Sequence, residues 1–212
     1  TSRGLGDVYK RQVALTVEFT LDMSKLPKSP FTDVTAGAWY YDAALYAYNK
    51  GLMVGTSDTA FSPNMPMTRA MLVAVLHRLA GSPSVSGKMP FTDVEADTWY
   101  TKAVLWAYQN DIVAGTSDTT FEPLSNITRE QIVAIFSRYT AKFAPDKAKA
   151  TAELTAFADS ASVSDWAVND MKWAVAQKII GGRENGGRLY LAPQGNASRA
   201  EVATILMQYC AL

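Results

Sequence analysis

A stretch of about 50 residues recurs three times in this chain, and this repetition constrains the fold more than any other feature. The phrase FTDVTAGAWYYDAALYA begins at Phe31, and FTDVEADTWYTKAVLWA begins 60 positions later at Phe91. The same offset relates a longer set of residues, namely Asp33, Trp39, Gly55, Thr56, Asp58, Phe61, Pro63, Thr68 and Arg69, to Asp93, Trp99, Gly115, Thr116, Asp118, Phe121, Pro123, Thr128 and Arg129. A constant offset over so many positions indicates a duplicated structural unit.

A third, more diverged copy follows the lysine- and alanine-rich linker AKFAPDKAKATAELTA. It has one additional residue before its tryptophan and a longer loop before its proline. Its marker residues keep their order: Phe157, Asp159, Trp166, Gly182, Pro193, Ser198 and Arg199. We therefore assign three repeats, over residues 31–81, 91–141 and 157–212, which together form one module.

Each repeat predicts a helix, a loop and a second helix. The first helix contains DAALYAYNKG, KAVLWAYQND or DMKWAVAQK. The second has apolar residues at i, i+3, i+4 and i+7, such as Leu72, Val75, Leu76 and Leu79, which form one helical face. A unit of about 50 residues is too small to bury such a face alone. We expect a mainly α fold in which three helix–loop–helix repeats form a pseudo-threefold helical bundle, with loops and short strands projecting outward.

The residues before Phe31 lie outside the repeats. SRGLGDVYKRQ resembles the translation of a sequencing-library adapter, so we expect residues 1–12 to be an artefact unrelated to the fold. VALTVEFTLDMSKLP alternates apolar and polar residues, which predicts a strand. We interpret residues 13–30 as the remnant and linker of an upstream β-domain. On this interpretation, the missing signal peptide says nothing about location.

Charge and composition exclude several classes of protein. Twenty basic residues balance 20 acidic ones, so no broad basic field is available for nucleic acid or an anionic membrane. Any anion site must be local. The single cysteine, Cys210, excludes a disulfide framework, and its apolar helical stripe predicts a buried, inert thiol. Apolar runs of about 18 residues are missing from the sequence, so we expect no membrane insertion.

Catalytic and metal-binding signals are weak. The only histidine, His77, lies inside a predicted helix without a nucleophile motif, so we expect a packed or surface residue. One Cys and one His do not make a zinc site, and the TSDT loops have too few carboxylates for calcium. The carboxylate pair of a glycosidase is not singled out either. We expect no enzyme activity, no metal and no cofactor.

A hydroxyl residue and an arginine open the second helix of every repeat, in MTRAM, ITREQ and ASRAE. Ser and Thr are typical N-caps, because the hydroxyl accepts a hydrogen bond from a free helix amide. Gln131 and Glu201 complete a capping box three residues later, whereas Met71 cannot. The arginine needs another explanation, since a cation at the first helical position faces the positive end of the helix dipole.

Two interpretations of Arg69, Arg129 and Arg199 are open. In the first interpretation, each arginine is a surface residue paired with a nearby acid, such as an Asp of the same or adjacent copy. Alternatively, the guanidinium and the helix amides together bind an external carboxylate or phosphate. Because all three copies keep the unfavourable placement, we favour the anion site.

The other repeated polar and aromatic residues also have two interpretations. Asp33, Asp93 and Asp159 fit a turn or cap as well as they fit a ligand site. Core packing is the default for the tryptophans, but aromatic faces beside Asp and Arg also suit sugar rings. The tryptophans are Trp39, Trp99 and Trp166.

The repeat resembles the S-layer homology (SLH) family over residues 31–212. SLH repeats begin with F-x-D-V, place a W-Y pair before the first helix, continue through a Gly and Asp turn to F-x-P, and open the second helix with T-R-A-E. The resemblance implies an extracellular module that anchors a bacterial surface protein non-covalently to secondary cell-wall polysaccharide. The family's ligand is typically a pyruvylated polymer containing N-acetylmannosamine, bound in grooves between repeats.

The resemblance also implies roles for the repeated residues. Arg69, Arg129 and Arg199 would meet the pyruvyl carboxylate. Asp33, Asp93 and Asp159 would accept hydrogen bonds from hydroxyls or amides, and Trp39, Trp99 and Trp166 would form groove walls.

Several positions depart from the family pattern. GTSDTAF and GTSDTTF replace the usual Gly-Asp-Gly-Thr-Phe turn, the third copy has GGRENGGRLYL, and the T-R-A-E glutamate survives only as Glu201. An alternative function is a segment of a structural S-layer protein that acts through protein–protein contacts.

Overall fold

The computed structural model describes residues 29–212. The artefact proposed for residues 1–12 and the strand predicted from Val13 lie outside the described residues. The described part is mainly α-helical, as predicted. Its α-helices are α1 (Tyr41–Asn49), α2 (Arg69–Leu79), α3 (Thr101–Gln109), α4 (Arg129–Phe143), α5 (Val168–Ala176) and α6 (Arg199–Cys210). A short antiparallel hairpin joins β1 (Arg183–Asn185) to β2 (Arg188–Tyr190) within the third repeat.

The second helix of each repeat begins where its cap residue predicts. The side chains of Thr68, Thr128 and Ser198 accept hydrogen bonds from the backbone amides three residues later. The capping boxes expected at Gln131 and Glu201 are both formed. These caps satisfy amides that would otherwise have no partner at the helix start.

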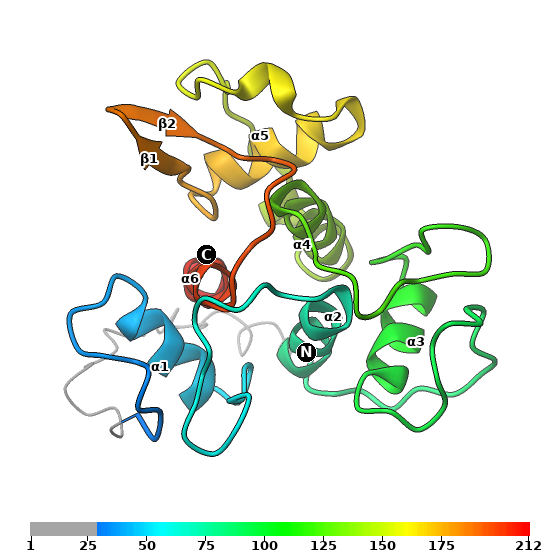
Figure 1. The fold of residues 1–212 in the computed structure, drawn as a ribbon. Helices are drawn as coiled ribbons and strands as arrows, with labels where there is room; N and C mark the ends of the chain where they lie inside the picture. The colour runs from blue at the N-terminus through cyan, green and yellow to red at the C-terminus, as the bar shows by residue number, and fades with distance from the viewer. Residues whose placement is uncertain (1–28) are drawn as a thin grey trace, which may run out of the picture.

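The first helix of each repeat packs against the second helix of a different repeat. α3 packs on α2, α5 packs on α4, and α1 packs on α6 (Figure 1). Each repeat therefore covers the repeat that precedes it, and the first repeat covers the third. The predicted apolar face of the second helix is largely buried in this arrangement, as at Leu72, Val75 and Leu76.

Three buried residues join the repeats through a ring of backbone hydrogen bonds. The Met67 amide donates to the Ala197 carbonyl at 2.8 Å, the Ala197 amide to the Ile127 carbonyl at 3.3 Å, and the Ile127 amide to the Met67 carbonyl at 2.9 Å. Each of these residues lies directly before the cap of a second helix. The N-terminal ends of α2, α4 and α6 are thereby gathered around one centre (Figure 1).

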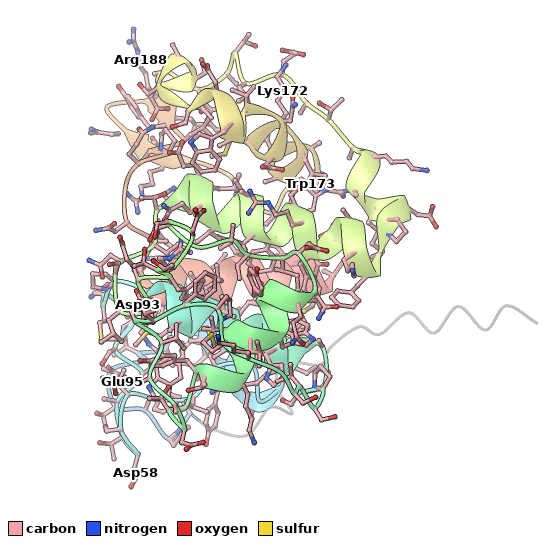
Figure 2. The ribbon with its side chains drawn as sticks, turned by 90° about the vertical axis from the view of Figure 1, so that its right-hand side faces the viewer. Asp58, Asp93, Glu95, Lys172, Trp173 and Arg188 are labelled. Atoms are coloured by element: carbon pink, nitrogen blue, oxygen red, sulfur yellow. The ribbon has the colours of Figure 1, made fainter. Side chains whose placement is uncertain are left out.

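One hydrophobic core runs through the three repeats and includes residues of every α-helix. Figure 2 shows Trp173 between α5 and α4, where its side chain is buried and its indole Nε1 donates to the Lys147 carbonyl at 3.0 Å. Within residues 29–212, the helices are too short and too polar to cross a membrane.

Cys210 is exposed at the end of α6, so the prediction of a buried thiol was wrong. Tyr209 and Leu212 on either side of it pack against the core, whereas Cys210 is left partly in solvent. Partial burial still raises the pKa of the Cys210 thiol, while the neighbouring Tyr46 and Lys50 lower it.

Candidate ligand grooves between repeats

Three of the concave surfaces on the described part of the chain lie over the second helices, one over each. We call them the first, second and third grooves, according to the repeat whose second helix forms the floor. Their volumes are about 480, 460 and 770 Å³. The floor residues come from α2, α4 and α6, and the loop before F-x-P supplies one side, for example Gly55 and Thr56 in the first groove.

Every groove is completed by side chains from the other two repeats. Counted around the ring from the repeat that forms the floor, the next repeat contributes a tryptophan and the previous repeat contributes a helix-opening arginine. Trp99 and Arg199 line the first groove, Trp166 and Arg69 the second, and Trp39 and Arg129 the third. The structure therefore brings together the predicted tryptophans and arginines in pairs, and each pair needs all three repeats.

The three tryptophans are exposed, with 66% of Trp39, 57% of Trp99 and 54% of Trp166 accessible to solvent. The default expectation of core packing was wrong. The tyrosines that follow Trp39 and Trp99 hold them edge-on, with ring centroids 5.3 and 5.0 Å apart. An exposed indole beside a groove offers a flat apolar face together with an N–H donor, a combination that suits a sugar ring.

The helix-opening arginines are buried, so the alternative interpretation of them as surface residues is wrong, and the favoured role in binding an external anion stays a prediction. Only 7% of Arg69, 4% of Arg129 and 5% of Arg199 is exposed. Each Nε donates to a backbone carbonyl of the following repeat around the ring. Arg69 donates to Phe121 at 2.8 Å, Arg129 to Leu191 at 2.7 Å, and Arg199 to Phe61 at 2.7 Å.

These bonds explain why a cation is kept at an unfavourable helix position. Carbonyl oxygens of the neighbouring repeat offset the positive end of the helix dipole. The guanidinium groups of Arg69 and Arg199 also lie over aromatic rings of that repeat, 4.6 Å from the Phe121 centroid and 4.7 Å from the Phe61 centroid. The arginines therefore hold adjacent repeats together and line the grooves at the same time.

Arg69 and Arg199 keep donors that the described protein does not use. A terminal nitrogen of Arg69 donates to the Ala114 carbonyl, and one of Arg199 donates to the Val54 carbonyl. Within residues 29–212, the other terminal nitrogen of each guanidinium makes no hydrogen bond. Burial lowers the pKa of Arg199 to about 10, while the nearby Asp33 raises it. The side chain is thus charged at neutral pH.

Arg129 has a different environment. Its terminal nitrogen Nη1 donates to Oε1 of Glu201 at 3.0 Å. Glu201 also accepts two hydrogen bonds from Arg183, each 2.8 Å long, and one from the Ser198 amide at 2.9 Å. The third groove therefore contains an internal ion-pair network that holds two guanidinium groups.

The three aspartates bind backbone amides. Each carboxylate accepts two amide hydrogen bonds of 2.7–2.8 Å, from the first two residues of the F-x-P segment, which reads Leu-Ala-Pro in the third repeat. The pairs are Asp33 with Phe61 and Ser62, Asp93 with Phe121 and Glu122, and Asp159 with Leu191 and Ala192. The second amide of each pair belongs to a residue with a positive φ of 48–56°. The turn interpretation is confirmed. These aspartates are not among the described residues that line the three grooves. A ligand-binding role for them stays a prediction.

Three further groove cations were not singled out in the sequence: Arg183 in the third groove and two residues at equivalent positions of α2 and α4. Arg78 lines the first groove and Arg138 the second, nine positions after the helix-opening arginine. The signal was present, because these residues are also 60 positions apart. The third repeat has Gln208 at this position.

His77 lies half-buried at the side of α2. Its Nε2 is 2.9 Å from the Pro83 carbonyl oxygen, and its ring centroid is 5.2 Å from that of Trp106. These contacts agree with the prediction of a packed or surface residue. Over residues 29–212, the structure holds no cluster of three His, Cys, Asp or Glu side chains arranged for a metal ion.

Comparison with known families identifies the repeats. The model of the S-layer homology domain matches residues 30–70, 90–133 and 156–203. The chain is 33% identical to an amylopullulanase from Thermoanaerobacterium thermosulfurigenes over 79% of its length, and 31% identical to an endoglucanase from Bacillus sp. (strain KSM-635) over 86%. It is 30% identical to the surface-layer 125 kDa protein of Lysinibacillus sphaericus over 73% of its length. The chain spans 9%, 19% and 13% of these three proteins, respectively.

Proposed function

Because the chain belongs to the S-layer homology domain family, we propose that residues 31–212 form a non-catalytic module that anchors a surface protein to the bacterial cell wall. The ligand is secondary cell-wall polysaccharide, bound in the grooves between repeats, and the three repeats act together as a pseudo-threefold bundle. The module works outside the cell, at the cell wall.

The observation that carries this proposal is the pairing of an exposed tryptophan with an arginine from another repeat in every groove. A sugar ring has apolar C–H faces that pack on an indole, and an acidic substituent pairs with a guanidinium. A pyruvylated sugar has both features. This polysaccharide class therefore fits the chemistry of the grooves.

The named relatives support attachment over catalysis. Two are named as enzymes that act on polysaccharides and one as a surface-layer protein, yet each resembles this chain over less than a fifth of its own length. A segment shared by proteins of such different names suits a general task such as attachment. A second candidate, lattice formation through protein–protein contacts, is favoured by the surface-layer relative and by the exposed indoles.

A pull-down on purified cell-wall sacculi tests the proposal. The chain should sediment with intact sacculi, lose this binding after chemical removal of the polysaccharide, and be competed by the isolated pyruvylated polymer. Binding that persists on stripped sacculi would contradict polysaccharide recognition. Self-association that ignores the polymer would instead support lattice formation.

A further inference from the structure

The loop that carries Trp166 differs from the two loops that carry Trp39 and Trp99. It has one additional residue before the tryptophan, and Ala167 follows the indole where the other two copies have a tyrosine. Those tyrosines lie edge-on to Trp39 and Trp99, whereas within residues 29–212 no aromatic ring pairs with Trp166. The third indole, at the side of the second groove, therefore lacks the aromatic support of the other two.

A buried carboxylate from the second repeat contacts this loop. Glu130, the second residue of α4, is only 4% exposed, and its carboxylate accepts hydrogen bonds from the amide and the hydroxyl of Ser164 at 3.1 and 2.9 Å. The Ser164 carbonyl in turn accepts the Ala167 amide at 2.8 Å. Trp166 thus lies inside a turn that begins at the residue held by Glu130.

Glu130 also bonds a second loop of the third repeat. The Nε2 of Gln194 donates to Oε2 of Glu130 at 3.4 Å and to the Ser162 carbonyl at 2.6 Å. Over residues 29–212, Glu130 forms no ion pair, so its donors are all neutral groups. Burial of a charge is unfavourable unless hydrogen bonds satisfy it. The carboxylate and the loop of the third repeat therefore hold each other in place.

The corresponding position in the other two second helices carries no such group. Ala70 and Ala200 occupy it, and both are fully buried. The loop before Trp99 is instead held from within its own repeat, where the Thr98 amide donates to the Thr101 hydroxyl at 3.0 Å. Among the three described repeats, the carboxylate that crosses between repeats thus coincides with the altered tryptophan loop.

We propose that Glu130 is a positioning residue for wall binding, which acts from the second repeat on the loop of the third and thereby holds the Trp166 indole at the second groove. This inference rests on the proposed function and adds to it a residue outside the groove lining. A side chain that is ordered before binding avoids the free-energy cost of ordering it during binding. The charge of Glu130 by itself disfavours an acidic ligand, so its benefit has to come through the loop.

Glu130→Ala, which introduces the residue found at positions 70 and 200, tests the proposal on the full chain. Binding to purified sacculi should weaken by about two- to tenfold, the cost of ordering one side chain during binding. Glu130→Gln should bind like the wild-type chain, because its amide oxygen can accept from the Ser164 amide while its NH₂ group donates to the Ser164 hydroxyl. Glu130→Ala with wild-type affinity overturns the proposal.

The control for charge is Glu122→Gln. Glu122 is an exposed acid of the same repeat that lies near Arg69, which lines the second groove. Its neutralisation removes a carboxylate near the groove without touching the loop of Trp166, so binding should stay equal or become stronger. Weakening of the same size in Glu122→Gln and Glu130→Ala would mean that charge, and not position, is responsible, which also overturns the proposal.

Two further readouts separate positioning from a general loss of structure. In a Trp166→Ala background, Glu130→Ala should cause no further loss of binding, and an equal loss in both backgrounds overturns the proposal. In NMR relaxation measurements without ligand, the indole N–H of Trp166 should become more mobile in Glu130→Ala, while those of Trp39 and Trp99 should not change. A Trp166 indole that stays as ordered as in the wild-type chain is a second contradiction.

The outcomes distinguish this inference from the function on which it rests. A wild-type chain that does not bind sacculi contradicts wall anchoring and the role of Glu130 together, whereas unaltered binding of Glu130→Ala contradicts only the latter. Circular dichroism checks that each variant is folded. If Glu130→Ala does not fold, Ser164→Ala takes its place in the same measurements, since it removes one donor to the carboxylate and should weaken binding by about twofold.

Discussion

The Nε of Arg199 donates a hydrogen bond to the carbonyl oxygen of Phe61 at 2.7 Å, which joins the last repeat to the first across 138 positions of sequence. The equivalent bonds of Arg69 and Arg129 join the other neighbouring repeats. The arginines that line the grooves therefore also close the ring. Their replacement does not separate loss of binding from loss of structure.

Arg199→Ala should lower the free energy of unfolding by about 2–3 kcal/mol, because the buried carbonyl oxygen of Phe61 loses its donor and the ring of Phe61 loses its cation. Urea denaturation measures this change. Arg188→Ala, at an exposed site on β2 far from the ring centre (Figure 2), is the control and should change stability by less than about 0.5 kcal/mol. Equal effects of the two variants would refute the closing role of Arg199.

Asp93→Asn should lower the free energy of unfolding by about 1–3 kcal/mol. In the wild-type chain two backbone amides donate to the two carboxylate oxygens of Asp93, whereas in the variant one of them would face the NH₂ group of Asn, which is itself a donor. The matched control is Asp58→Asn, at the outer end of its loop (Figure 2), where the side chain makes no hydrogen bond to residues 29–212. Chemical denaturation of both variants gives the comparison. A neutral Asp93→Asn would mean that the two amide bonds do not stabilise the turn.

Gly115→Ala should destabilise the second repeat by about 1–3 kcal/mol through overpacking. A Cβ at this position would lie 2.5 Å from the Thr120 carbonyl oxygen and 2.7 Å from Cε1 of Phe91. Gly181→Ala is the control, since a Cβ there meets no described atom within 4 Å. Thermal unfolding of the two variants should show a lower Tm for Gly115→Ala only.

The ion-pair network of Glu201 should make stability depend on pH. Burial alone would raise the pKa of Glu201, but hydrogen bonds from Arg183 and the Ser198 amide, with the charge of Arg129, hold it below its ordinary value of 4.5. The folded state thus favours the charged form. The resulting stabilisation is complete above about pH 4.5 and is lost as the pH falls through the folded-state pKa.

The matched variant for this prediction is Glu201→Gln, which removes the titrating group but keeps a capping side chain. We expect it to be about 1–2 kcal/mol less stable than the wild-type chain at pH 7. Unfolding free energies measured from pH 7 to pH 3 should show this difference shrinking below pH 4.5. A difference that stays constant across the range would show that Glu201 does not titrate with folding.

Trp99→Ala and Trp166→Ala should each weaken binding to sacculi by about tenfold, and the double variant should lose far more, because two grooves on one polymer act together. Their Tm values should stay close to that of the wild-type chain, since 57% and 54% of these side chains are exposed. Leu124→Ala, which replaces another exposed apolar residue, is the control for non-specific loss. Unchanged sedimentation of the double variant would contradict sugar binding at these indoles.

Groove composition could be read in part from the sequence. The offset of 60 positions singled out the tryptophans and the helix-opening arginines, and it also marks Arg78 and Arg138. The exposure of the tryptophans could not be predicted, because an apolar aromatic residue is as suitable for a core as for a groove wall. The pairing of Trp99 with Arg199 depends on how the third repeat meets the first.

The sequence by itself determined the three repeats, the helices within them, and the capping boxes at Gln131 and Glu201. The repeats show as a recurring pattern of residues, and the helices and caps depend on residues three or four positions apart, so neighbouring side chains specify them. Only the tertiary structure decided which helices pack together, where each guanidinium finds its carbonyl, and that Arg183 reaches Glu201. Those partners are brought together by the burial of three apolar faces in one core, and the bonds of the arginines run across 52 to 138 positions of the chain.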